Sequence, residues 1–380
     1  MKKLIVYLVI FALLAVILPK SLLAIYDPQS VPNNKFGIHI LFPEEIGEAA
    51  ALVNSSGGDW GYVTIPIRAS DKNLKKWQTF MDECKKHHLI PVIRIATEGD
   101  YFINGSWEIP SKYYVIDFAN FLNSLNWPTK NRYIVIFNEQ NRGDEWGGVP
   151  DPVAYADILN YAVDIFKSRN SNFFIIFGGL DNAAPNVYGQ YINQLDYIRQ
   201  VEYAIPGVLS KIDGIAVHSY PNPGFSSPPT YQGQNSIHAH NYVKNLLYQI
   251  TGKNVPIFIT ETGWSNASIR YQTQAGYYKT AFENAWSDSS VIAVTPFLLL
   301  ANTEPFGQFS FIKNGTKTEL YKAYQNFDKT KGAPMLEPLI KQQNNNIEIT
   351  NIIDFSEKIK KSIDILDNNA KYFFKWLLNI

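Results

Sequence analysis

The chain has 380 residues, of which 46% are hydrophobic and 14% aromatic, a composition that excludes an intrinsically disordered protein. Basic and acidic residues each number 34, so the formal net charge is zero, which argues against a nucleic-acid partner because such proteins need a basic surface. The single cysteine, Cys84, excludes an intrachain disulfide.

The N-terminus has the pattern of an export signal. Lys2 and Lys3 precede the apolar run of residues 4–18, and Ala24 is a small residue at which cleavage is expected. The apolar run is shorter than the roughly 20 residues of a typical membrane span. We therefore predict that the protein is exported, and that residues 1–24 are a signal peptide or a membrane anchor.

Short apolar runs alternate with longer amphipathic stretches through the middle of the chain. Eight runs have the β-branched and aromatic content of buried strands, at residues 35–40, 61–67, 90–96, 132–138, 173–179, 213–219, 255–261 and 291–299. Helices are predicted at residues 152–170, 238–253, 273–288 and 318–327. Apolar strands that alternate with helices indicate a parallel sheet, and eight such units predict an α/β fold, a (β/α)8 TIM barrel, over residues 25–332.

A doubly wound open sheet is the alternative fold, but no glycine-rich phosphate-binding loop follows the first predicted strand. The C-terminal stretch, residues 333–380, begins as a polar linker and becomes amphipathic. It is compatible with a helical tail that packs on the barrel or is partly disordered, and equally with a segment that contacts a membrane interface or a partner.

Two glutamates lie where predicted strands stop. Glu139 ends the fourth strand and Glu261 ends the seventh, so in a barrel they face each other across the mouth, where catalytic groups of this fold lie. Retaining glycosidases use two carboxyl groups about 5–5.5 Å apart, one as nucleophile and one as acid/base. This chemistry uses neither a metal nor a cofactor, and we predict none.

The segments "FNEQN" and "ITETGW" around these glutamates resemble the two signatures of the retaining glycoside hydrolases of clan A. The resemblance covers residues 35–330. It implies a β-glycoside hydrolase that acts on neutral oligo- or polysaccharides, with Glu139 as the acid/base and Glu261 as the nucleophile. It also implies that Asn138 binds the sugar 2-hydroxyl, a contact that strengthens in the transition state.

The sixth predicted strand ends in "HSY", which fits the same resemblance. Of His218 and Tyr220, one is expected to hydrogen-bond to Glu261 and the other to line the sugar site. His39, on the first strand, is a candidate substrate contact, with a buried core histidine as the alternative.

Two positions depart from the clan pattern. Thr64 stands where many members carry an arginine inside the second strand, so Arg94 on the third strand or Arg68 just past the second is predicted to substitute for it. Where many members carry a tryptophan on the eighth strand, Phe297 is the nearest aromatic residue. Both departures concern the sugar-binding subsite next to the scissile bond.

Aromatic rings bind the apolar faces of sugars, and two tryptophans follow the catalytic strands. Trp264 comes after the predicted nucleophile, and Trp146 lies in the loop after the fourth strand. We predict that both contact substrate.

Two rival interpretations are of other classes. A metal-dependent barrel hydrolase would need a histidine pair at the end of the first strand, whereas His238 and His240 lie at a helix start and His87–His88 at a helix end. An exported, non-catalytic carbohydrate-binding barrel would have a decayed site, whereas both glutamates are present. A carbohydrate hydrolase is therefore the favoured prediction.

Overall fold

The computed structural model describes residues 25–99 and 105–337. The predicted export signal and anchor at residues 1–24, and the predicted tail from residue 338 onward, lie outside this part of the chain. None of the helices within the described residues combines the length and apolar character that crossing a membrane requires.

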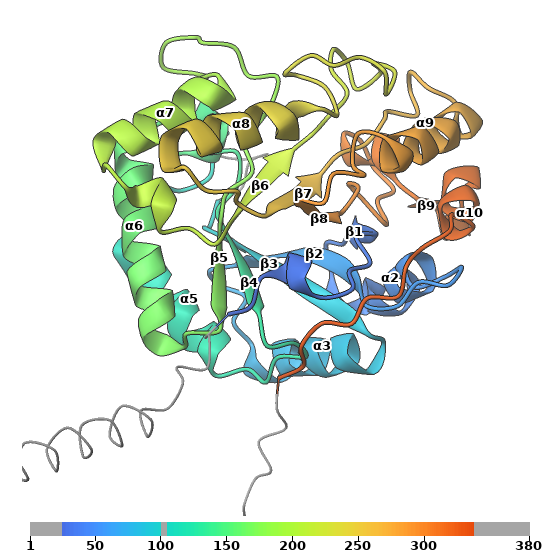
Figure 1. Ribbon diagram of the computed structural model, residues 1–380, viewed down its shortest axis with the longest axis horizontal. Coiled ribbons are helices and arrows are strands. Elements are labelled where there is room, and N and C mark those ends of the chain that lie inside the picture. Colours follow the sequence, from blue (N-terminus) through green and yellow to red (C-terminus); the bar gives the residue numbers. More distant parts are fainter. Residues whose placement is uncertain (1–24, 100–104, 338–380) are drawn as a thin grey trace, which may run out of the picture. The chain divides into compact units, whose positions relative to one another are not determined.

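Eight parallel strands form the centre of the molecule, each hydrogen-bonded to the next in chain order (Figure 1). They are β1 (Gly37–His39), β2 (Gly61–Arg68), β3 (Leu89–Ala96), β4 (Arg132–Ile136), β5 (Phe173–Phe177), β6 (Gly214–His218), β7 (Ile257–Glu261) and β8 (Val291–Val294). The sheet closes where Phe36 bridges Val294 and the Val294 N–H donates to the Lys35 carbonyl at 2.8 Å. All eight predicted strands and the (β/α)8 barrel are confirmed.

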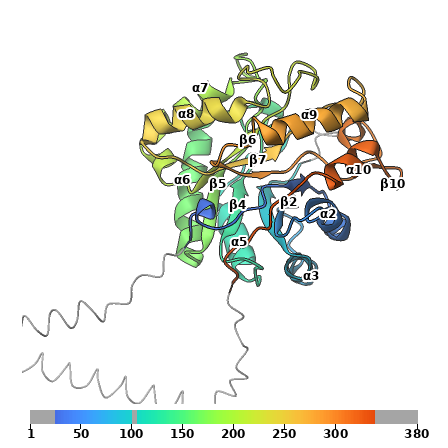
Figure 2. The same cartoon turned by 45° about the vertical axis from the view of Figure 1, so that its right-hand side comes forward.

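Helices surround the strands on the outside of the barrel (Figures 1 and 2). They are α2 (Ile46–Val53), α3 (Leu74–Lys86), α5 (Lys112–Asn123), α6 (Pro152–Arg169), α7 (Gln194–Ala204), α8 (Ala239–Thr251), α9 (Tyr271–Glu283) and α10 (Glu319–Gln325). A short hairpin of β9 (Ile312–Lys313) and β10 (Thr316–Lys317) follows β8. The four helices predicted from sequence are α6, α8, α9 and α10, and each is present.

Helix α6 illustrates how the sequence fixes these elements and positions the site. Asp151 accepts hydrogen bonds from the N–H groups of Val153 and Ala154, and proline occupies the first helical position. On the buried face, the Tyr155 hydroxyl donates to the Ile136 carbonyl at 3.1 Å and accepts from the Gly178 N–H at 3.0 Å. The helix thereby holds the ends of β4 and β5, where functional side chains begin.

The lower half of the barrel interior is filled by aromatic rings. Tyr133 lies 5.0 Å from Phe174 and 5.2 Å from Phe258 between ring centroids, and Tyr62 packs edge-on against Tyr133 at 6.3 Å. All four side chains are buried. Burying each such side chain stabilises the fold by about 1.5–3 kcal/mol, so this layer makes a rigid floor under the upper half.

Both ends of the described chain meet at the bottom of the barrel. The Tyr26 N–H donates to the Asn131 side chain at 3.1 Å, and the Met335 N–H donates to the Tyr26 hydroxyl at 3.3 Å. Glu337 forms an ion pair with Arg132, at the start of β4, at 3.3 Å. The barrel contacts therefore continue past the predicted domain end at residue 332, as far as Glu337.

Candidate active site

The C-terminal ends of the strands surround a cavity of about 520 Å³. This volume is within the range of about 300–1,000 Å³ common for small-ligand sites. The charged side chains that line it are Arg68, Arg94, Glu108, Glu139, Arg142, Glu145, Asp181 and Glu261. The cavity thus occupies the face where (β/α)8 enzymes carry their active sites.

Glu139 reaches this cavity through an unusual backbone turn. Strand β4 ends at Ile136, and the next residues include Phe137 with φ +64° and Glu139 with φ +37°, both in the left-handed region. Such conformations cost about 1–3 kcal/mol for residues other than glycine and concentrate at functional sites. The Glu139 N–H donates to the Gly179 carbonyl at 2.8 Å, which fixes the turn against the end of β5.

The two predicted catalytic carboxylates lie together. One oxygen of Glu139, one oxygen of Glu261 and a ring nitrogen of His218 are all within 4.8 Å of one another. Both glutamates are at least nine-tenths buried. The structure therefore brings the ends of β4 and β7 into one site, as the sequence predicts.

His218 hydrogen-bonds to Glu139 and not to Glu261. Its Nδ1 atom lies 2.7 Å from Glu139 Oε1 and 3.8 Å from Glu261 Oε2. Burial lowers the pKa of His218, but the two carboxylates more than offset this and the net shift is upward. Burial likewise raises the pKa of Glu139, but the His218 hydrogen bond and the nearby Arg142 and Arg94 outweigh it and lower that pKa. Both shifts favour the pair of a Glu139 carboxylate and a protonated His218.

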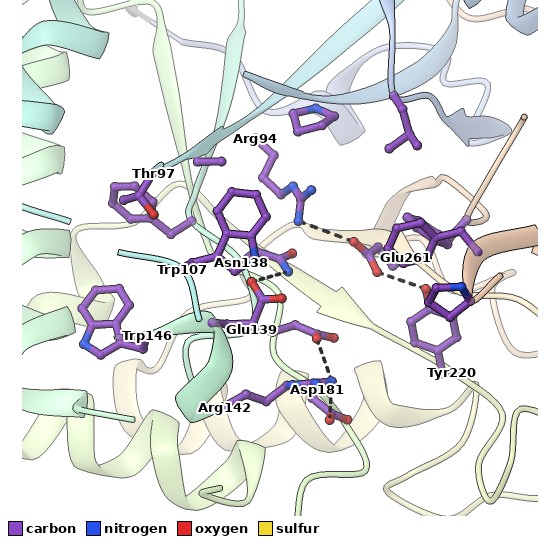
Figure 3. Close-up of a pocket in the computed structure, with 18 of the residues that line it drawn as sticks. Arg94, Thr97, Trp107, Asn138, Glu139, Arg142, Trp146, Asp181, Tyr220 and Glu261 are labelled. Atoms are coloured by element: carbon purple, nitrogen blue, oxygen red, sulfur yellow. Dashed lines mark hydrogen bonds and ion pairs between the residues drawn. The ribbon is translucent and has the colours of Figure 1, made fainter. Parts of the chain in front are cut away.

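We predicted that one of His218 and Tyr220 hydrogen-bonds to Glu261 and that the other lines the sugar site. Tyr220 does both. Its hydroxyl donates to Glu261 Oε2 at 3.0 Å, and its ring lines the cavity (Figure 3). Gly179 makes the room for His218, since a side-chain carbon at that position would overlap the imidazole ring. Sequence reasoning did not single out Gly179, which reads there as the end of a strand.

Arg94, and not Arg68, lies beside Glu261. Arg94 Nη1 is 3.7 Å from Glu261 Oε1 and points toward it from β3 (Figure 3). Arg68 instead donates to the Gly99 carbonyl at 2.6 Å and covers the ring of Trp107. Of the two arginines predicted as substitutes for the missing strand-two arginine, the structure places Arg94 at the carboxylate.

His39 lies beneath the same carboxylate. Its Nε2 is 3.9 Å from Glu261 Oε1, the side chain is fully buried, and neither ring nitrogen has a hydrogen-bond partner. Burial, reinforced by Arg94 and His218, holds the pKa of His39 well below its usual value, so the ring is neutral. His39 does not line the cavity, and the alternative of a buried core histidine describes it better than direct substrate contact.

Asn138 contacts a third carboxyl group that sequence reasoning missed. The Asn138 side-chain N–H donates to Glu145 Oε2 at 3.4 Å, and both residues line the cavity. Burial and the neighbouring Glu139 raise the pKa of Glu145 to about 8, so Glu145 is protonated at neutral pH. Glu145 belongs to the loop after β4, where no periodic pattern could have identified it.

The two predicted sugar-stacking tryptophans are both core residues. Trp146 is 1% exposed and packs edge-on against Phe137 and Tyr155, so it supports the cavity wall from behind, although it borders the cavity. Trp264 is also 1% exposed, lies outside the cavity lining and donates to the Ser227 carbonyl at 2.8 Å. The prediction for Trp264 is wrong because its ring turns into the helical layer, against Tyr278.

Other aromatic side chains form the accessible wall. Trp107, under Arg68, lines one side of the cavity and was not predicted, because its loop has no strand or helix pattern. Phe297, the predicted nearest aromatic on β8, lines the cavity near Glu261. The neighbouring rings on that side are Tyr220, Phe225, Phe306 and Phe309.

The three-residue cluster of Glu139, His218 and Glu261 also has the proximity that a metal site needs. In this arrangement His218 Nδ1, which lies near both carboxylates, is 2.7 Å from Glu139 Oε1, a hydrogen-bond distance at which no ion can lie between the two atoms. Arg94 beside Glu261 and Arg142 beside Glu139 add positive charge that a cation would have to approach.

The histidine pair of the metal-enzyme rival lies elsewhere. His238 Nε2 pairs with the Pro229 carbonyl at 2.9 Å, and His240 Nδ1 with the Ile237 carbonyl at 3.1 Å. Both residues are at the start of α8, and neither lines the cavity. Backbone hydrogen bonds therefore account for this pair.

Comparison with known proteins bears on the fold. No protein-family model and no curated protein matches the chain. A family 39 glycoside hydrolase from the gut symbiont Bacteroides cellulosilyticus WH2 matches with a TM-score of 0.57 and 16% identity, over 79% of this chain and 64% of that one. The barrel resembles those of clan A glycoside hydrolases.

Two further solved structures have the same clan-type barrel. A family 39 β-xylosidase from Caulobacter crescentus has a TM-score of 0.53 and 13% identity, over 77% of this chain and 70% of that one. An exo-β-1,4-mannosidase from Opitutaceae bacterium strain TAV5 has a TM-score of 0.53 and 13% identity, over 81% and 61%. The chain thus spans about two thirds of these glycoside hydrolases, and the likeness is one of fold.

Proposed function

We propose that the protein is a retaining glycoside hydrolase that cleaves β-glycosidic bonds, with Glu261 as nucleophile and Glu139 as general acid/base. One observation carries the proposal: carboxylate oxygens from the ends of β4 and β7 lie within 4.8 Å of each other in one cavity. Retaining enzymes hold these groups about 5–5.5 Å apart, whereas inverting enzymes need about 6.5–9.5 Å to admit a water.

In the first step, an oxygen of Glu261 bonds to the anomeric carbon as the bond from that carbon to the leaving oxygen breaks. Tyr220 donates to Oε2, so that oxygen is already engaged and Oε1 is the better nucleophile. Arg94 Nη1, 3.7 Å from Oε1, attracts this carboxylate and holds it in place.

The leaving oxygen takes a proton from Glu139 in the same step. Before sugar binds, Glu139 is a carboxylate with the proton on His218, 2.7 Å away, which is the state that the two pKa shifts favour. Bound sugar expels water, and a drier site favours the neutral pair over the ion pair, so the proton passes to Glu139. In the second step Glu139, again a carboxylate, takes a proton from the water that attacks the glycosyl ester and releases Glu261.

The substrate class follows from the walls of the cavity. Aromatic rings stand on two sides, with Trp107 on one and Phe297, Phe306 and Phe309 on the other, which suits the apolar faces of uncharged sugars. The matched structures include a β-xylosidase and an exo-β-1,4-mannosidase, which supports a β-linked substrate. Neutral β-linked oligo- or polysaccharides are therefore the proposed substrates.

A mechanism-based trap tests the proposal. The full chain is incubated with 2-fluoro-glycosyl inactivators of several sugars, and the labelled peptide is located by mass spectrometry. We expect a covalent label on Glu261 and none in Glu261→Gln. A label on another residue, or release of a product with inverted anomeric configuration by NMR, would contradict the double displacement.

A second experiment separates the enzyme from a non-catalytic sugar-binding barrel. A panel of β-linked glucans, mannans, xylans and galactans is assayed for reducing ends and, separately, for binding. Binding that is equal in the wild type and Glu261→Gln, with turnover in neither, would favour the binding protein.

A further inference from the structure

Arg142 lies between three carboxylates at the edge of the cavity. Its Nε and Nη2 atoms contact the two oxygens of Asp144 at 3.0 and 2.6 Å. The remaining nitrogen, Nη1, lies 3.4 Å from Glu139 Oε2 and 3.5 Å from Asp181 Oδ2 (Figure 3). Asp144 therefore anchors the guanidinium, and one nitrogen is left for two other carboxylates.

Each competing carboxylate has one oxygen to offer. Oε1 of Glu139 is bonded to His218 at 2.7 Å, and Oδ1 of Asp181 accepts from the Ala183 N–H at 2.8 Å. The oxygens that face Nη1 are Glu139 Oε2 and Asp181 Oδ2, and the two N–H groups of Nη1 can reach one each, so the guanidinium approaches one carboxylate closely only by moving away from the other. Both distances exceed the 2.7–2.9 Å of a charge-assisted hydrogen bond, so Nη1 is shared and fully committed to neither.

Backbone contacts hold the two sides of this arrangement together. The Arg142 N–H donates to the Glu139 carbonyl at 2.8 Å, which folds the loop after β4 into a tight turn. Asn141 donates to the Asp181 carbonyl and accepts from the Asp181 N–H, each at 3.0 Å, which joins that loop to the loop after β5. Small side-chain movements can thus exchange the partner of Arg142 while the backbone stays fixed.

We infer that Arg142 is a positioning residue that controls when Glu139 carries its proton, and that Asp181 competes with Glu139 for the same guanidinium nitrogen. The inference deepens the proposed function and rests on it for its catalytic meaning. It assigns a role to the segment "NR" that follows the acid/base glutamate and to an aspartate that sequence reasoning did not select.

The inference explains how Glu139 can alternate between acid and base. When Glu139 is a carboxylate, Arg142 and His218 both stabilise it. When Glu139 holds a proton, Arg142 stays paired with Asp144, and its Nη1 atom can move toward Asp181 and away from Glu139. Burial and the charge of Glu139 raise the pKa of Asp181 to about 6, so its charge responds to whether Glu139 is charged.

Other titratable groups around Glu139 set the background for any titration. They are Arg94 from β3, Asp144 and Glu145 from the loop after β4, His218 from β6, Tyr220 just after β6, and Glu261 from β7. None of these groups is substituted in the variants of Arg142 and Asp181, so shifts of opposite sign in those variants report on the charges of Arg142 and Asp181.

The decisive measurement is the titration of Glu139 itself. The full chain is labelled with ¹³C at glutamate side-chain carboxyls, the Glu139 signal is assigned with Glu139→Gln, and its NMR shift is followed with pH. Arg142→Gln should move the midpoint upward by about 1 pH unit or more, because a nearby cation is lost. Asp181→Asn should move it downward, because a competing anion is lost and Arg142 turns to Glu139.

Two further variants serve as controls. Arg142→Lys keeps a cation and should leave the midpoint closer to that of the wild type than Arg142→Gln does. Arg199→Gln removes an arginine that pairs with Asp196 at 2.9 Å on α7, outside the cavity, and should not move the midpoint. Shifts of the same sign in Arg142→Gln and Asp181→Asn, or no shift in either, would overturn the inference.

The titration does not depend on turnover, so it distinguishes the two proposals. Where a glycan is hydrolysed, the alkaline limb of the pH profile of kcat/KM reports loss of the proton held by the His218–Glu139 pair, and it should shift in the same direction as the NMR midpoint in each variant. Opposite midpoint shifts without hydrolysis of any glycan would refute the proposed function alone. Hydrolysis with an unmoved midpoint would refute the role of Arg142 alone.

Discussion

The lower and upper halves of the barrel interior differ in whether their buried polar atoms have hydrogen-bond partners. At the bottom, the Tyr62 hydroxyl donates to Asn33 at 2.7 Å, and the Asn131 side chain bonds both backbone groups of Tyr26 and the Tyr133 hydroxyl. At the top, atoms without any partner gather near the strand ends: both ring nitrogens of His39, Arg94 Nε, Asn138 Oδ1, Gln140 Oε1, Ser219 Oγ and Thr260 Oγ1.

This contrast separates residues that stabilise the fold, at the bottom, from residues that form the candidate active site, at the top. A buried polar atom without a partner costs about 1–3 kcal/mol, so most such atoms in proteins are paired. Among residues 25–99 and 105–337, the bottom has one such unpaired atom, Arg132 Nε at the start of β4. The upper half therefore carries a stability cost that the aromatic floor offsets, and substitutions in the two halves should differ in kind.

The largest expected effect is on activity, at the top. Glu139→Gln should lower kcat on unactivated β-glycosides by about 10²–10⁴-fold, because the proton donor is lost. Aryl glycosides with good leaving groups should be less affected in the first step. Thermal unfolding of the variant should match or exceed that of the wild type. A variant that unfolds earlier yet keeps its activity would break the contrast.

The next effect is on stability, at the bottom. Phe258→Ala, in the middle of the aromatic floor, should lower the free energy of unfolding by about 3–5 kcal/mol, measured with denaturant. Phe258→Leu is the matched control and should cost less than about 1.5 kcal/mol. The KM of the folded fraction should stay near that of the wild type, and a large change in KM would show that the floor also shapes the site.

Glu145→Gln tests the stability cost of the upper half of the barrel. The substitution should stabilise the protein, and the gain should depend on pH. The pKa of Glu145 is raised to about 8 in the folded state, so between its ordinary value near 4.5 and about 8 the folded chain holds a proton that the unfolded chain has lost. Wild-type stability therefore falls as pH rises through this window. The variant should gain on the order of 1–3 kcal/mol at pH 9 and little at pH 4, and equal gains at both pH values would contradict this.

The smallest effect is the loss of one paired hydroxyl at the bottom. Tyr62→Phe removes the donor to Asn33 and should cost about 0.5–1.5 kcal/mol, without a change in kcat. Asn33→Ala and the double variant complete a cycle in which the two costs should not add. Strict additivity would mean that the hydroxyl pair contributes nothing.

The barrel was predictable from sequence because its strands are buried on both faces and read as continuous apolar runs. Glu139 and Glu261 were predictable for a related reason: a carboxylate stands out at the end of such a run. Asn138 and Arg94 lie in or beside the same runs, and the structure places both on the cavity. The site residues that could be predicted from the sequence therefore lie in strands or at their ends.

The loops carry the part that was not predictable. Trp107, Arg142, Glu145 and Asp181 follow strands β3, β4 and β5 in segments without periodicity, and only the fold brings them together. The contact between His218 and Glu139 was not predictable either, because the sequence leaves open which of His218 and Tyr220 contacts Glu261.

The meeting of both ends of the described chain at the bottom of the barrel has a consequence for attachment. Ile25 and Glu337 lie at the face where strands begin, whereas the cavity opens where strands end. A solid support joined directly at Ile25 or at Glu337 would thus hold the barrel by the face opposite the cavity. The opening would then face outward, toward polymers too large to diffuse around the protein.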